Sequence, residues 1–232
     1  LHSRNYPTTT SSSAATTGLF LFRRHFEITD INFISFRQEC ANSMSASISN
    51  LRNSLKGEIV DLHSCNGLLA ITVGILGSQD YDEKVVVYSP TTRQHRLIPH
   101  VDTLPKSCSL QNLNIVFDPS KFDHYKLVHV WSAWGWIEYV DTCKFEVYSS
   151  ETGVWRESKG LSSTDDEDVN FRKGVLWNGD LRWLSKNGYT PCFDFENECL
   201  RNNLPSLPKT SQPMFCFSGC QERICVLLRK KT

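Results

Sequence analysis

Two cysteine-containing groups have the residue types and spacing that could perform chemistry. Cys216, Cys220 and Cys225 could offer three thiolates to a zinc ion, but no histidine lies nearby to complete a tetrahedral site, and buried thiols are the favoured interpretation. His63 and Cys65 are two residues apart, so they share one face of a strand and resemble a base and a thiol nucleophile. Packing beneath a turn is the favoured interpretation of that pair. The Gly-x-Ser-x-Gly motif and glycine-rich phosphate loops are absent. The sequence therefore predicts no catalytic residue, no metal site and no cofactor.

Charged residues give little support for a nucleic-acid partner. The chain has 232 residues with 25 Lys+Arg against 25 Asp+Glu, which excludes a strongly basic nucleic-acid binder. The acidic run at 165–168 could hold a cation or a basic peptide, but four adjacent carboxylates favour a solvated loop. The basic residues at 229–231 are likewise expected to form a solvated end.

Composition also bears on the compartment. No apolar run approaches the roughly 18 residues of a membrane helix, so no membrane partner is expected. Nine cysteines, an odd number, and the lack of any Asn-x-Ser/Thr acceptor argue against secretion and favour reduced thiols in the cytoplasm, the nucleus or both. An organellar transit peptide is the alternative, because no acidic residue precedes Glu27 while Arg4, Arg23 and Arg24 do. The chain begins with Leu1 and not Met, and we expect it to be a piece of a longer product.

The elements that would position such residues are short β-strands. Residues 1–17 form a Ser/Thr-rich segment that is expected to be disordered. The best helical pattern, 36–55, is rich in serine and asparagine and is expected to be mainly a polar loop. From residue 18 onward, apolar runs alternate with turn signals and predict an all-β chain. The predicted strands fall into three sets of four: 59–62, 68–73, 84–88 and 95–98; 113–117, 125–130, 143–148 and 154–157; 172–176, 181–185, 192–195 and 198–204.

Two kinds of internal echo connect these sets. Residues 86–94 are echoed sixty positions later by 146–155, and more weakly by 193–198, each as a strand, a polar turn and a returning strand. The segments around Asn66-Gly67 and Asn178-Gly179 form the second kind, with Ser218-Gly219 as a further echo. Sets of four strands every 40 to 50 residues or so are typical of propeller blades. Unrelated hairpins in a β-sandwich are the alternative.

Five ordered phrases resemble the F-box-associated region of plant F-box proteins. They include a Ser-Cys-Asn-Gly-Leu-Leu strand entry, a Thr-Thr-Arg-Gln turn and a Trp-Asn-Gly hairpin. Ser89 and Leu127 depart from the family's Asn and Val at two positions. The phrases lie at 64–69, 88–94, 117–128, 146–156 and 174–184.

The resemblance implies a kelch-like β-propeller at 18–228, followed by a basic tail at 229–232. The span supplies about four to five blades, so an incomplete ring is one expected arrangement. In this family such a domain captures a target protein without catalysis, while an F-box docks on the Skp1 adaptor of a cullin–RING ubiquitin ligase (an SCF complex). No segment here resembles an F-box, so a Skp1 partner is expected only if one is encoded upstream. The alternative is a standalone interaction protein of the same fold; a carbohydrate-acting propeller enzyme is a distant third.

Target capture is expected at loops of one propeller rim, where exposed aromatic residues anchor interfaces. One candidate segment carries Trp131, Trp134, Trp136 and Tyr139. The alternative for Trp131 and Trp136 is packing between blades. The second candidate is the 74–83 loop, with Leu76 and Tyr81. The sequence does not identify the target protein.

Overall fold

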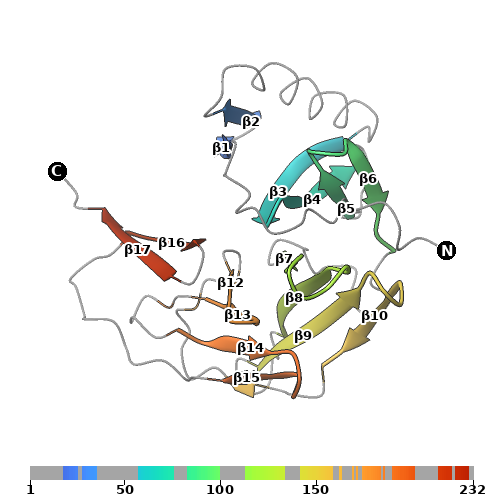
Figure 1. Ribbon diagram of the computed structural model, residues 1–232, viewed down its shortest axis with the longest axis vertical. Coiled ribbons are helices and arrows are strands. Elements are labelled where there is room, and N and C mark those ends of the chain that lie inside the picture. The colour runs from blue at the N-terminus through green and yellow to red at the C-terminus, as the bar shows by residue number, and fades with distance from the viewer. Residues whose placement is uncertain are drawn as a thin grey trace. The chain divides into compact units, whose positions relative to one another are not determined.

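The computed structural model describes residues 18–25, 28–35, 57–75, 83–99, 113–133, 142–158, 162–163, 169, 171, 174–183, 185, 190–201, 214–220 and 223–229. Every regular element among them is a β-strand (Figure 1). No helix in these ranges has the length and hydropathy needed to cross a membrane. The strands belong to two compact units, Leu1–Gln111 and Asn112–Thr232.

The first unit contains a hairpin and a four-stranded antiparallel sheet. Strands β1 (Gly18–His25) and β2 (Ile28–Ser35) form the hairpin. The sheet is built in chain order from β3 (Gly57–Cys65), β4 (Leu68–Ile75), β5 (Glu83–Ser89) and β6 (Gln94–Leu97). Its two central strands are rich in valine, isoleucine and leucine, which fit a pleated, buried surface. They supply most of a small core: Ile59, Leu69, Ile71, Val73, Val86 and Tyr88.

The second unit contains two sheets that follow the same plan. One runs through β7 (Leu113–Val116), β8 (Lys126–Ala133), β9 (Thr142–Ser149) and β10 (Val154–Glu157). The other runs through β12 (Val175–Trp177), β13 (Asp180–Arg182), β14 (Cys192–Asp194) and β15 (Cys199–Arg201). A last hairpin pairs β16 (Met214–Cys220) with β17 (Arg223–Arg229).

The predicted architecture is confirmed: each predicted set of four strands forms one antiparallel sheet with its strands in chain order. One element was not expected. Strand β11 (Ser162–Ser163) pairs with the part of β9 that β10 leaves uncovered. The prediction that Ser218-Gly219 is equivalent to the Asn-Gly turns is wrong. These two residues pair with Cys225 and Ile224 inside the β16–β17 hairpin and do not form its turn. The predicted polar loop at 36–55 and the segment 1–17 lie outside the described residues.

Two of the three sheets begin with a two-residue turn of Asn-Gly. Asn66 and Gly67 have φ values of 43° and 84°, and Asn178 and Gly179 have 51° and 89°. Two successive positive φ values define the type I′ turn, which matches the twist of the strands it joins. Only glycine adopts this region without strain, and asparagine tolerates it better than other residues.

Gly67→Val is therefore expected to destabilise the first sheet by about 1–3 kcal/mol, the usual cost of holding a side chain in a disfavoured backbone region. An added Cβ would meet no atom within 4 Å, so the loss comes from backbone strain and not from a clash. Chemical denaturation of Gly67→Val beside Gly67→Asn measures it. Equal stability of the two variants would contradict a left-handed conformation at this position.

The last hairpin of each sheet closes with a four-residue turn whose fourth residue has a positive φ. These residues are Arg93 at 58°, Gly153 at 75° and Glu198 at 50°. In two of the turns, the strand residue before the turn accepts a hydrogen bond from the backbone N–H three residues on: Thr92 to Ser89 Oγ at 3.4 Å, and Asn197 to Asp194 Oδ1 at 3.2 Å. The weak echo at 193–198 is therefore the same hairpin as the two stronger ones.

The principal core lies between the two sheets of the second unit. It combines Val116, Val128, Val130 and Phe145 from one sheet with Leu181, Trp183 and Phe193 from the other, and with Phe171. Trp183 is fully buried and contacts two other rings, Phe171 at 5.2 Å and Phe145 at 6.2 Å between centroids. Trp183 was expected in the core. Trp155 and Trp177, which were also expected there, are only partly buried because they lie on edge strands.

One buried amide also links these two sheets. Asn114, on β7, donates from Nδ2 to the Phe171 carbonyl at 2.7 Å and accepts from the Gly174 N–H at 2.8 Å. The Trp183 indole N–H donates to the same carbonyl at 3.0 Å. A Cβ on Gly174 would lie only 2.7–2.8 Å from Leu181, Trp183 and Asn114, so this position accepts only glycine. The packing of the two sheets here depends on hydrogen bonds to backbone groups, which the hydrophobic periodicity of the sequence does not reveal.

Candidate interaction surface

The predicted contact residues lie in two connections between strands. Leu76 and Tyr81 belong to the segment between β4 and β5; Trp134, Trp136 and Tyr139 belong to the segment between β8 and β9. All five lie outside the described residues. Trp131 is placed in the backbone of β8, opposite Lys144, but its side chain is outside the described part. Their role in binding therefore stays a prediction.

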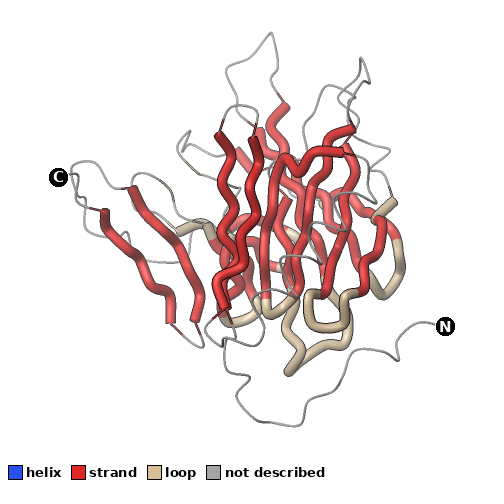
Figure 2. Tube along the Cα trace, turned by 90° about the horizontal axis from the view of Figure 1, so that it is seen from above, coloured by secondary structure: helices blue, strands red, loops and turns tan. Residues whose placement is uncertain are grey.

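The strand order relates these two connections to each other. Each joins the second and third strands of its sheet. In an antiparallel sheet with strands in chain order, such a connection lies at the end opposite the first and last turns of the sheet. The described turns, drawn in tan in Figure 2, close those other ends. By this equivalence in strand order, we name residues 76–82 the candidate interaction surface of the first unit and residues 134–141 that of the second.

The strands hold the bases of both connections firmly. β8 and β9 stay paired up to Ala133 and Thr142, and β4 and β5 stay paired up to Gly74 and Glu83. β11 supports β9 from its other edge, opposite Thr142 and Cys143. Loops carried on rigid strand ends are the usual carriers of recognition in β-rich folds.

A histidine and a glutamate lie opposite each other in the second sheet, and the sequence analysis did not single them out. His129 Nδ1 is 3.8 Å from Glu146 Oε2, and the two side chains are 0% and 1% exposed. Such a pair could act as a general base only if it reached a substrate, because the base must contact the proton it removes. Because both side chains are buried, we infer that the pair stabilises the contact between β8 and β9. A polar residue between two buried valines, as in Val128-His129-Val130, is the sequence signal that could have found it.

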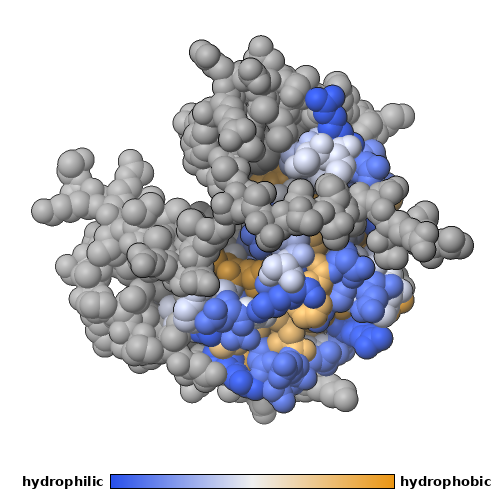
Figure 3. All heavy atoms as spheres, viewed as in Figure 1, coloured by the Kyte–Doolittle hydropathy of each residue, from blue (hydrophilic) through white to orange (hydrophobic). Residues whose placement is uncertain are grey.

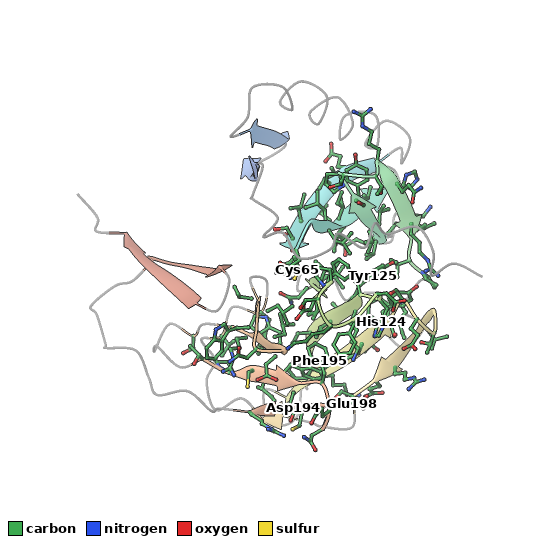
Figure 4. All side chains as sticks on the ribbon, viewed as in Figure 1. Cys65, His124, Tyr125, Asp194, Phe195 and Glu198 are labelled. Atoms are coloured by element: carbon green, nitrogen blue, oxygen red, sulfur yellow. The ribbon has the colours of Figure 1, made fainter. Side chains whose placement is uncertain are left out.

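The turn between β14 and β15 gathers charged and polar groups around Asp194 (Figure 4). Its carboxylate accepts from Asn197 Nδ2 at 2.7 Å and from the Glu196 N–H at 2.8 Å, and it forms an ion pair with Arg201. The amide of Asn197 is the main reason why the pKa of Asp194 lies below its usual value. These bonds are all local to one hairpin, so the group stabilises a turn.

No metal or thiol chemistry is assembled in the part of the chain that is described. Its His, Cys, Asp and Glu residues include no group of three placed to hold a metal ion. Burial raises the pKa of the Cys192 thiol, which makes it a poorer nucleophile at neutral pH. His63 and Cys65 lie on β3, opposite Ala70 and Leu68 of β4, and both are partly buried. The side chains of Cys216, Cys220 and Cys225 lie outside the described part.

Comparison with known families decides what these sheets are. Residues 19–232 match the F-box associated beta propeller domain. The chain belongs to this family. Its four-stranded sheets are blades of a propeller, and the β-sandwich alternative is wrong.

A curated relative of this F-box associated domain is F-box protein At5g07610 of Arabidopsis thaliana. The two are 26% identical over 170 residues, which is 71% of this chain and 39% of the relative. The chain thus spans well under half the length of that protein. In this F-box associated domain, residues 76–82 connect strands of the sheet β3–β6, and residues 134–141 connect strands of the sheet β7–β10.

Proposed function

We propose that this chain is the substrate-recognition part of an F-box subunit of an SCF ubiquitin ligase. The family match over residues 19–232 carries the proposal. In this role a kelch-like propeller binds a target protein, and an F-box elsewhere in the full protein docks on Skp1. The domain contributes binding and no catalysis, and it acts in the cytoplasm or nucleus.

The geometry that supports target binding is the difference between the two ends of the blades. One end closes with short turns whose backbone conformations are determined by Asn-Gly pairs and by residues of positive φ. At the other end, the connections 76–82 and 134–141 are longer and contain the apolar and aromatic residues Leu76, Tyr81, Trp134, Trp136 and Tyr139. Tryptophan and tyrosine contribute a large share of the binding energy in protein interfaces.

The test begins with the transcript upstream of the codon for Leu1. We expect an in-frame segment of about 50 codons or more, enough for a small helical Skp1-binding unit. The protein encoded by the longer reading frame should capture Skp1, and deletion of the upstream segment should abolish capture. A start codon directly upstream without such a segment would overturn the ligase assignment and leave a standalone interaction protein.

Trp134→Ala is expected to weaken target capture at least tenfold while the thermal unfolding temperature stays within a few degrees of wild type. An exposed interface anchor contributes about 2 kcal/mol or more to binding and little to folding. Quantitative co-precipitation from plant extract, followed by calorimetry, measures the two effects. Tyr81→Ala, in the other connection, should also weaken capture. A large loss of stability with unchanged capture would show that Trp134 is a core residue.

A further inference from the structure

The outer edge of the first sheet carries an unusual set of side chains. Strand β6 is the last strand of this sheet and pairs with β5. All four of its residues, Gln94, His95, Arg96 and Leu97, are exposed. Leu97 is 54% exposed and is one of only a few large apolar side chains that the described residues leave in solvent.

The hydrogen-bond register shows which backbone groups of β6 are available. The Ile98 N–H donates to the Val85 carbonyl at 2.9 Å, so Ile98 and Val85 form a hydrogen-bonded pair. Such pairs alternate along an antiparallel ladder, which makes Arg96 with Val87 the next one. Leu97 and His95 flank Arg96 on the strand and belong to the non-hydrogen-bonded pairs, so their N–H and C=O groups point away from β5. Pro99 has no N–H and ends this edge, so it can receive only a short segment.

The second blade shows what this edge lacks. At the sixty-residue spacing, Lys84, Arg96 and Leu97 correspond to Lys144, Arg156 and Glu157. In the second blade Lys144 Nζ is 3.2 Å from Glu157 Oε1. In the first blade a leucine replaces that glutamate, and Lys84 makes no ion pair among the described residues.

The cations near this edge have no ion-pair partner among the described residues. Lys84, Arg93 and Arg96 are all exposed, and no carboxylate of the described residues forms an ion pair with any of them. The third blade differs again, because Arg201 on its outer strand is paired with Asp194. Among the described residues, the outer strand of the first blade differs from that of the second in two respects: Leu97 stands in place of Glu157, and Lys84 has no ion-pair partner. Figure 3 shows hydrophilic side chains, in blue, where β6 runs.

We propose that the edge of β6 binds a short, extended, acidic segment of a partner protein as an added strand. The partner's backbone would pair with His95 and Leu97, which is the known mode of strand addition at a sheet edge. Its carboxylates would meet Arg96 on one face of the sheet and Arg93 at the adjoining turn, and an apolar residue would cover Leu97 on the other face, which Lys84 shares. A second copy of this chain is disfavoured as the partner, since edge-to-edge pairing would bring the same cations together. This proposal uses none of the residues of the candidate interaction surface and does not depend on it.

Binding is tested by fluorescence anisotropy on the whole chain with a labelled eight-residue peptide of alternating valine and glutamate. We expect binding that weakens at least tenfold when lysine replaces glutamate in the peptide. Methylation of every second peptide nitrogen should weaken it by a similar factor, because it removes the donors needed for strand addition. Failure of the acidic peptide to bind, or equal binding of the methylated peptide, would overturn the proposal.

Variants of the chain locate the site. Arg96→Glu and Leu97→Glu should each reduce binding at least tenfold; the second change restores the glutamate that the second blade has at this position. Arg156→Glu is the matched control at the equivalent position of β10, and it should change binding less than twofold. Both substituted positions on β6 are exposed, so thermal unfolding should stay within a few degrees of wild type. An equal effect of Arg156→Glu would show nonspecific attraction and overturn the proposal.

Two further measurements decide between occupants. Replacing the acidic run 165–168 by serine should leave the affinity for the peptide unchanged. A tenfold gain in affinity would mean that the chain's own acidic run occupies the edge of β6, and would overturn the proposal that a partner protein binds there. Sedimentation should show the same mass for wild type and Leu97→Glu; a dimer lost in the variant would identify a second copy instead. Trp134→Ala should not affect peptide binding, which separates this site from the proposed target surface.

Discussion

Replacing Trp183 by alanine is expected to remove about 3–5 kcal/mol of the free energy of unfolding. Its ring is fully buried and contacts Phe145 and Phe171, so truncation leaves a cavity in the core of the second unit. It also removes the indole N–H that donates to the Phe171 carbonyl at 3.0 Å. For a chain of this length, the loss corresponds to a fall in Tm on the order of 10 °C, measurable by calorimetry.

Two variants make this result specific. Trp183→Phe keeps most of the packing and loses the hydrogen bond, so it should cost about 1–2 kcal/mol. Trp155→Ala removes a partly buried ring that contacts Tyr148 at 5.4 Å between centroids, and should cost less than Trp183→Ala. If the two alanine variants were equally stable, the two sheets would not share the core seen here.

Asn114→Leu is the second large effect, with an expected loss of about 2–4 kcal/mol. Leucine has a similar size, but it leaves the buried Gly174 N–H without its acceptor and removes one donor from the Phe171 carbonyl. A buried polar group without a partner costs about 1–3 kcal/mol. Urea denaturation monitored by tryptophan fluorescence measures the change.

The matched control is Gln94→Leu, which makes the same kind of change at an exposed strand position. It should alter stability by less than about 0.5 kcal/mol, as is usual for surface positions. Asn114→Asp keeps the acceptor for Gly174 but loses the donor and buries a charge, so it should also be destabilised. Wild-type stability of Asn114→Leu would show that the amide does not link the two sheets.

The hairpins were predictable because their information is local. Asn66-Gly67 and Asn178-Gly179 specify a type I′ turn by their own conformational preferences, whatever surrounds them. The echo between 86–94 and 146–155 was recognisable for the same reason, and both segments fold into hairpins with matching registers. β11 was missed because two serines carry no strand signal; its pairing depends on the part of β9 that β10 leaves open.

The candidate interaction surface was predicted only in part. The sequence located Leu76, Tyr81, Trp134, Trp136 and Tyr139 between strands, and the strand order shows that their connections are equivalent in the two blades. Their contacts stay predictions. The edge of β6 was missed, although a residue-by-residue comparison of the two echoes would have shown Leu97 where the second blade has Glu157. The difference matters because Lys84 is exposed and has no ion-pair partner among the described residues, and both of these properties depend on the folded sheet.

The sequence by itself determined that this chain is all-β, that three of its sheets are sets of four strands in chain order, and which family it belongs to, because turn preferences and strand patterns act over a few residues. Only the tertiary structure decided how the second and third blades are joined. Asn114, Phe171, Gly174 and Trp183 come from separate segments, and their hydrogen bonds form only when two sheets pack together. It also decided which charges are neutralised, since Lys144 pairs with Glu157 across the sheet while Lys84 pairs with no acidic side chain of the described residues. Partnerships of this kind depend on distances in space, and a linear pattern does not contain them.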